Sequence, residues 1–224
     1  MRMKTRMLLG LALGISLFTT SCSDFLTEDP KGRLTPETYF STQDELNMSV
    51  YALYQKINQS QIYANMQYPQ WQGDDITTNP GSNKQAAAEI DRFSVANNNK
   101  GLTAVWNMHY GIIKAANFII ANAEKTPTSE EEINIALGQA KYWRGYAYFT
   151  LVRLFGPLPM NLDNVNDDYT LPLTPAEGVY EQIVKDLTGA EAVLPTGYKD
   201  APRFMNGVNI YVTCQGVKAT LAAV

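Results

Sequence analysis

Histidine, cysteine and strand-like patterns are scarce in this chain. Its 224 residues include one histidine, His109, and two cysteines. The sequence contains no G-x-S-x-G nucleophile motif, no H-E-x-x-H zinc motif, no P-loop and no Rossmann fingerprint. His109 falls within an apolar helical stripe, which predicts a buried core histidine and not a base or metal ligand. We therefore expect neither an enzyme nor a cofactor or metal site.

Basic residues are also fewer than acidic residues in this chain. The chain has 18 lysines and arginines against 22 acidic residues, and three of the basic residues lie within its first six positions. Without that leader, 15 basic residues face 22 acidic ones. Because phosphate binding needs a basic patch, this balance argues against nucleic acid as a partner.

No apolar run is long enough to cross a bilayer. Arg2, Lys4 and Arg6 precede a run of twelve mostly apolar residues at 7–18, whereas a membrane-spanning helix needs roughly 20. This order of charges and apolar residues is typical of an export signal, here over residues 1–21.

Cys22 follows directly after this leader and is preceded by small residues. A small residue before cysteine is what a lipoprotein signal peptidase accepts, so we expect lipidation of Cys22 and a protein anchored to a membrane without spanning it. An ordinary secretory signal, or a disulphide from Cys22 to Cys214, is the alternative. Residues 22–41 read as a solvated tether that carries Asp24, Glu28 and Asp29.

The segment 140–159, AKYWRGYAYFTLVRLFGPLP, is the most informative stretch. Placed on a helix, this segment has apolar residues along a main stripe and also on the side opposite to it, which predicts a helix buried between neighbours. Arg144 falls in the middle of its main stripe, where a guanidinium needs a carboxylate or carbonyl partner. Gly156 and Pro157 end the helix. The main stripe consists of Ala140, Trp143, Ala147, Tyr148, Leu151, Leu154 and Phe155.

Helical patterns dominate the rest of the chain, and strand patterns are almost absent. Capping boxes occur at Thr42–Glu45 and Ser129–Glu132, and residues 85–93 form a short helix or strand. Pro175 and Asn209 are 34 residues apart, the period of a tetratricopeptide helix pair. The sequence ends in mid-helix, so we expect the N-terminal part of a longer protein. The expected helices are 42–59, a weaker one at 61–68, 102–124, 129–155, 175–194 and 208–224, and residues 42–224 form one helical domain.

A long polar stretch, 77–101, predicts a binding loop. Just before it, Trp71 offers a flat apolar face for a sugar ring, and Asp74 and Asp75 can accept hydrogen bonds from hydroxyls. Tyr68 and Asn79 extend this candidate ligand surface. Alternatively, Trp71 packs against the helices and Asp74 caps a turn. We disfavour reading Asp74 and Asp75 as glycosidase carboxylates, because adjacent side chains point apart and do not face each other across a gap.

Several of these segments together resemble one family. They are A-K-x-x-R-x-x-x-Y-F-x-L-V-R-L-F-G-x-x-P at 140–159, V-W-N-M-H-Y-G-I-I-K-A-A-N at 105–117, D-F-L-x-x-x-P after Cys22, and Q-G-V-K-A-T-L-A-A-V at 215–224. This set is similar to the SusD/RagB family of surface nutrient-binding lipoproteins of Bacteroidetes. The chain departs from the usual Gly-Asp-Val-Pro of that family, since it has Gly156-Pro-Leu-Pro159 instead.

The resemblance implies an all-α fold of tetratricopeptide-like helix pairs with long irregular loops. It implies a lipid-anchored protein on the outer surface of the outer membrane, exported there with the help of the acidic residues after Cys22. Its partner would be a TonB-dependent, SusC-like transporter, for which it captures an oligosaccharide without breaking a bond. In this reading Arg144, Trp143, Tyr148, Gly156 and Pro159 are structural. Peptide capture by the same architecture, and a helical-repeat scaffold that binds only proteins, are the alternatives.

Overall fold

The computed structural model describes residues 39–60, 73–75, 77–78, 81, 84–163 and 170–224. Over this part the chain is all-α, as predicted. The helices are α3 (Gln43–Ser60), α4 (Gln85–Asp91), α5 (Lys100–Asn122), α6 (Glu130–Phe155), α7 (Ala176–Glu191) and α8 (Cys214–Leu221), with a 3-10 turn, η5 (Ala123–Lys125), after α5. The strands are two antiparallel pairs of two residues each, β1 (Leu158–Pro159) with β2 (Leu173–Thr174), and β3 (Phe204–Met205) with β4 (Val208–Asn209).

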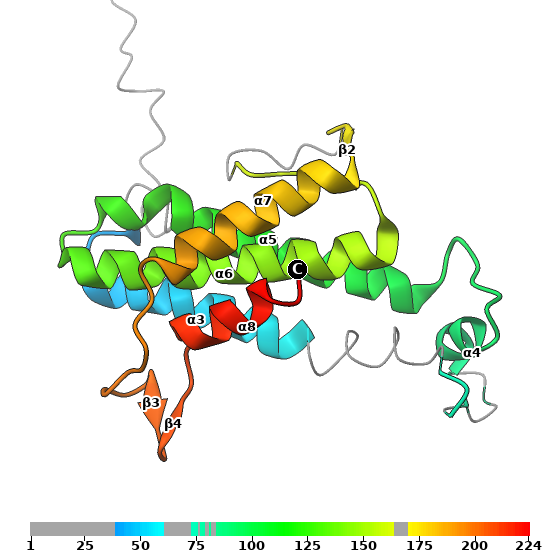
Figure 1. Ribbon diagram of the computed structural model, residues 1–224, viewed down its shortest axis with the longest axis horizontal. Helices are drawn as coiled ribbons and strands as arrows, with labels where there is room; N and C mark the ends of the chain where they lie inside the picture. The colour runs from blue at the N-terminus through cyan, green and yellow to red at the C-terminus, as the bar shows by residue number, and fades with distance from the viewer. Residues whose placement is uncertain (1–38, 61–72, 76, 79–80, 82–83, 164–169) are drawn as a thin grey trace, which may run out of the picture. The chain divides into compact units, whose positions relative to one another are not determined.

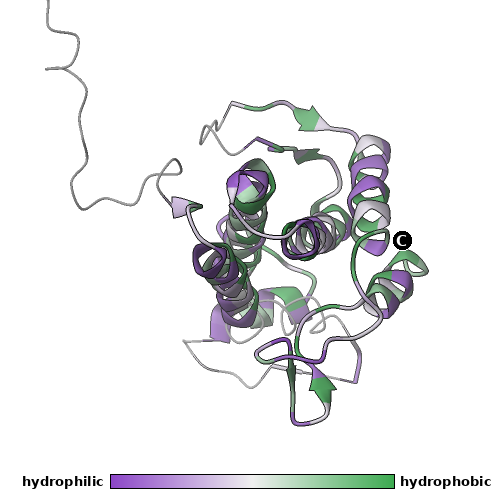
Figure 2. Cartoon of the chain, turned by 90° about the vertical axis from the view of Figure 1, so that its left-hand side faces the viewer, coloured by the Kyte–Doolittle hydropathy of each residue, from purple (hydrophilic) through white to green (hydrophobic). Residues whose placement is uncertain are grey.

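Helix α6 is the centre of the packing (Figure 1). It contacts α5 along one side and α7 along another, α3 packs on α5 and α6, and α8 packs on α7. Figure 2 looks along these helices and shows α6 between α3 and α5 on one side and α7 and α8 on the other. Apart from the short α4, helices that follow one another in the chain therefore pack as antiparallel neighbours, as in tetratricopeptide-like folds.

The residues of α6 form much of the core. Ala140, Ala147, Tyr148 and Leu151 are fully buried. The predicted stripe is wrong at Leu154, which is 36% exposed. A helical wheel assigns a residue to a face, but it does not say how far along the helix the neighbouring helices reach.

The predicted capping box at Thr42–Glu45 is confirmed, and that at Ser129–Glu132 is present in one of its two bonds. Thr42 N–H donates to Glu45 Oε2 at 3.0 Å and Glu45 N–H donates to Thr42 Oγ1 at 3.2 Å, the reciprocal bonds of a capping box. Ser129 Oγ accepts from Glu132 N–H at the start of α6. Before α3, Phe40 is buried against the core, so the packed part of the chain includes residues ahead of Thr42.

The predicted helix 208–224 is wrong over its first residues. Asn206 and Gly207 both have positive φ angles, 52° and 79°, which form the two-residue turn of a hairpin. Val208 and Asn209 therefore belong to β4, and α8 begins only at Cys214. The 34-residue spacing from Pro175 to Asn209 does not join two helix starts. Val208, Val212, Val217 and Leu221, all after this turn, suggested a continuous helix by their near-helical spacing.

Residues 85–91 and the connection after α6 have more regular structure than a plain loop. Residues 85–91 are helical and not extended. The connection after α6, which we expected to be irregular, contains the short pair β1–β2. Gly156, at φ 74°, ends α6, and its N–H donates to Val152 O at 2.9 Å. The predicted helix 61–68 lies outside the described residues.

Candidate functional site

An open groove of about 340 Å³ lies where the start of α5 meets the end of α6 and the segment 95–99. Its aromatic wall consists of Trp106 and Phe155. Val95, Ala96 and Leu102 supply its aliphatic lining. Asn97, Asn99 and Thr103 supply its polar groups. This volume is at the lower end of the roughly 300–1,000 Å³ of small-molecule sites.

The segment that forms one wall of the groove is hydrogen-bonded to α4, mainly through the Glu89 carboxylate. Glu89 Oε2 accepts from Asn99 Nδ2 at 2.8 Å and from Ala96 N–H at 3.3 Å. The same Asn99 amide donates to Ala86 O, and its Oδ1 accepts from the first N–H groups of α5. Asn99 is therefore buried, and both polar atoms of its side chain have hydrogen-bond partners. These bonds fix both the start of α5 and the loop.

These hydrogen bonds also set the charge behind the wall. They hold the pKa of the Glu89 carboxyl below its usual value, mainly through the bond from Asn99. Asp91 accepts from Thr78 N–H and Thr77 Oγ1, which likewise lowers the pKa of Asp91 and ties the preceding loop to α4. Both carboxylates are ionised at neutral pH.

The aromatic wall is preorganised by ring contacts. The Trp106 and Phe155 rings meet edge to face with centroids 5.1 Å apart, and Tyr110 lies 4.8 Å from Trp106 on its other side. The Tyr110 hydroxyl donates to Pro159 O at 2.8 Å, which joins α5 to the strand after α6. Trp106 is only half-buried, and its indole N–H has no hydrogen-bond partner among the described residues.

This combination has a specific chemical capacity. A partly exposed indole presents an apolar face and one N–H donor. The Asn97 side chain is exposed and offers both an amide donor and an amide acceptor. An apolar ring face beside neutral hydrogen-bonding groups suits the C–H face and the hydroxyls of a sugar ring.

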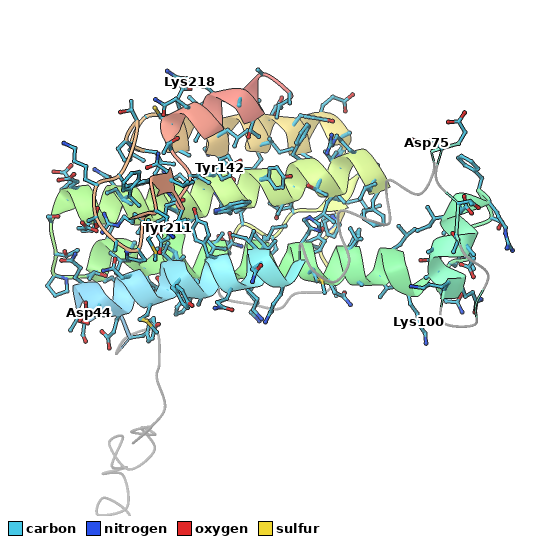
Figure 3. The ribbon with its side chains drawn as sticks, turned by 90° about the horizontal axis from the view of Figure 1, so that it is seen from below. Asp44, Asp75, Lys100, Tyr142, Tyr211 and Lys218 are labelled. Atoms are coloured by element: carbon cyan, nitrogen blue, oxygen red, sulfur yellow. The ribbon has the colours of Figure 1, made fainter. Side chains whose placement is uncertain are left out.

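Only two of the five predicted ligand residues lie in the part of the chain that the structure describes. Trp71, Tyr68 and Asn79 lie outside the described residues. Asp74 and Asp75 lie in an exposed turn and do not line the groove. Figure 3 shows the Asp75 side chain pointing away from the helices. A ligand surface around Trp71 stays a prediction.

Sequence reasoning missed Trp106 and Asn97. The apolar stripe of the expected helix 102–124 passes through Val105, and Trp106, the next residue, does not lie on that stripe. A tryptophan on the polar side of an amphipathic helix, a few residues after a polar loop, is the signal that could have found it.

The residues predicted to be structural lie mostly in the interior. Arg144 donates from Nε and Nη2 to the two oxygens of Asp186, at 2.8 and 2.7 Å, and from Nη1 to Asn117 Oδ1 at 2.8 Å. The Tyr148 hydroxyl donates to Asn161 O. Trp143 is half-buried against Tyr54, with ring centroids 5.7 Å apart. Pro159 lies in β1, and Gly156 ends α6.

His109 is buried, as predicted, with Nδ1 2.7 Å from Val105 O. Burial lowers the pKa of His109, so the imidazole is neutral at pH 7. Within the described ranges, no three His, Cys, Asp or Glu side chains gather closely enough to hold a metal ion. No helix in those ranges combines the length and apolarity needed to cross a membrane.

Known proteins match this chain over most of its length. SusD-like protein P2 of Formosa agariphila is 29% identical over 184 residues, which are 80% of this chain and 36% of that protein. A SusD-like protein of Bacteroides ovatus is 28% identical over 204 residues, 84% of this chain and 34% of that protein. The chain thus spans only about a third of the length of these relatives.

Solved structures share the fold. A laminarin-binding SusD-like protein superimposes with a TM-score of 0.71 at 19% identity, over 82% of this chain and 40% of that one. Surface glycan-binding protein A from Bacteroides fluxus gives a TM-score of 0.68 at 18% identity, over 82% and 39%. A family model described as "starch-binding associating with outer membrane" matches residues 24–207. The chain belongs to this SusD-like family.

Proposed function

We propose that this chain is the part of a cell-surface lipoprotein that captures an oligosaccharide for import across the outer membrane. It delivers the glycan to a TonB-dependent, SusC-like transporter and leaves its bonds intact. Membership of a family described as starch-binding supports this role, as do related folds named for binding laminarin and surface glycans.

The groove beside Trp106 carries this proposal within the described residues. It joins an aromatic wall to uncharged hydrogen-bonding groups, and the Glu89–Asn99 bond holds its loop in place. A site held in shape before the ligand arrives loses less entropy on binding. The residues around Trp71 are a second candidate ligand surface of this proposal.

The anchor is a further part of the proposal. Lipidated Cys22, after removal of residues 1–21, would hold the protein at the membrane. Residues 22–41 would then serve as the tether to the helical domain. Labelling with a fatty acid that is lost in Cys22→Ser tests this part independently of glycan binding.

Retention on native gels that contain polysaccharides tests the capture function. We expect laminarin or another neutral glycan to slow migration of the chain. We expect Trp106→Ala to lower the affinity at least roughly tenfold, because truncating a tryptophan that anchors a ligand can cost about 2 kcal/mol or more. Tyr51→Ala is the matched control, because Tyr51 is an exposed aromatic residue on α3, away from the groove lining.

The alternatives give different results in the same experiments. Saturable binding of peptides without any glycan binding would favour peptide capture. Co-purification with the transporter, without binding of glycan or peptide, would favour a scaffold. Release of reducing ends by the purified chain would contradict a non-catalytic role.

A further inference from the structure

We propose that the groove beside Trp106 selects uncharged glycans and rejects those that carry sulphate or carboxylate groups. This inference rests on the proposed function and adds the substrate class to it. It follows from the charges in and behind the groove wall.

The lining of the groove contains no ionisable side chain. Its polar members are two asparagines and a threonine, and the remaining members are aliphatic or aromatic. An anion that leaves water for such a surface finds no counter-charge to replace its hydration, which makes its transfer costly. A hydroxyl group loses much less, because amide and indole groups can bond to it.

A fixed negative charge stands directly behind one wall. The Glu89 carboxylate bonds to Ala96 N–H and to the Asn99 amide, and both of these residues line the groove. The carboxylate therefore lies one hydrogen bond from the lining. An anionic ligand would bring a second negative charge close to it, and the two like charges repel, less strongly as salt rises because Glu89 is partly open to solvent.

The nearby cations do not offset this charge within the groove. Lys100 and Arg92 are exposed to solvent and lie outside the lining. The Arg153 guanidinium sits 4.2 Å from the centroid of the Phe149 ring, a cation–π contact outside the groove lining. The amide hydrogens at the start of α5 that could attract an anion already bond to Asn99 Oδ1.

Long-range repulsion must be separated from this local effect. The chain carries a net charge of −4, so it repels polyanions as a whole. That repulsion is screened by salt, since the Debye length falls from about 10 Å at 0.1 M to about 3 Å at 1 M. The local cost of burying an unpaired anion in the groove persists at high salt.

Calorimetric titration with matched glycan pairs tests the inference. The probes are laminarin and dextran, each in its neutral form and as its sulphated derivative, at 0.1 M and 1 M NaCl. For a glycan that binds in its neutral form, we expect the sulphated derivative to bind at least roughly tenfold more weakly at both salt concentrations.

Three variants locate the effect. Asn97→Lys places a cation in the lining and should raise affinity for the sulphated form several-fold. Asn98→Lys adds the same charge at the neighbouring position, outside the lining, and should leave that affinity unchanged. Glu89→Gln removes the charge behind the wall and should also favour the sulphated form. Thermal melts of each variant check that the fold is kept.

The outcomes separate the two proposals. Equal or tighter binding of a sulphated glycan, or a preference that vanishes in 1 M NaCl, would overturn the selectivity and leave glycan capture standing. Equal effects of Asn97→Lys and Asn98→Lys would also overturn it. Absence of binding to any neutral or sulphated polysaccharide would overturn the proposed function and this inference with it.

Discussion

Arg144 on α6 and Asp186 on α7 form a two-point ion pair in the interior, with 7% and 2% of these residues exposed. Asn117 on α5 completes the group: its Oδ1 accepts from Arg144, and its Nδ2 donates to Asn161 O at 2.9 Å. One buried cluster therefore links three helices to the connection after α6.

Removing the guanidinium should destabilise the fold strongly. Arg144→Met leaves the Asp186 carboxylate buried without a counter-charge, with only the hydrogen bond from Gln182 Nε2, and breaking such a pair costs about 3–5 kcal/mol. The free energy of unfolding in urea measures this loss. The double variant Arg144→Met/Asp186→Leu should recover much of it, because an apolar pair leaves no buried charge. A double variant as unstable as the single one would contradict this account.

Gly156 should resist substitution. At φ 74° and ψ −130° it adopts a conformation that L side chains avoid, so Gly156→Ala should cost about 1–3 kcal/mol of unfolding free energy. Gly111 is the control, because a Cβ there meets nothing within 4 Å in the interior of α5. Gly111→Ala should stabilise the chain by about 0.5–1 kcal/mol. Similar losses in both variants would argue against strain at Gly156.

Asn99 should matter for both stability and binding. Asn99→Ala removes the cap of α5 and frees the loop from Glu89, at an expected cost of about 0.5–2 kcal/mol. Because the loop forms one wall of the groove, the affinity for a neutral glycan should also fall. Thermal melting and calorimetry measure the two effects. Unchanged affinity in a destabilised variant would show that the loop does not shape the site.

Stability should fall as pH drops below the ordinary histidine value. Burial lowers the folded-state pKa of His109 from 6.5, so the unfolded chain binds more protons than the folded chain between that lowered value and 6.5. Glu45 and Glu89 have pKa values lowered from an ordinary value of 4.5, so their protonation reduces stability only at lower pH. The unfolding free energy measured from pH 7.5 to 5 should decline in the wild type and stay flatter in His109→Gln. Equal slopes would contradict the assignment.

The sequence was sufficient for the parts of the fold set by local rules. The reciprocal bonds at Thr42 and Glu45 and the buried helix around Tyr148 follow from capping chemistry and apolar spacing. The hairpin at Asn206 and Gly207 did not follow, because valines at helical spacing beyond it outweighed the Asn-Gly turn signal.

The site was harder to predict than the fold. Asp186 interrupts the apolar stripe of α7, and that irregularity could have identified it as the partner of Arg144. The groove depends on a long-range meeting of Trp106 with Phe155, 49 positions apart, which no local pattern encodes. The polar stretch 77–101, which we expected to form a binding loop, supplies one groove wall, and ligand binding there stays a prediction.

The most direct test of glycan capture by the groove follows the indole N–H signals by nuclear magnetic resonance during titration with laminarin. The chain has three tryptophans, and Trp106→Phe identifies the Trp106 signal. We predict a saturable shift of that signal while the Trp143 signal stays in place. A shift of the Trp71 signal alone, with Trp106 unmoved at saturation, would contradict the groove as the binding site.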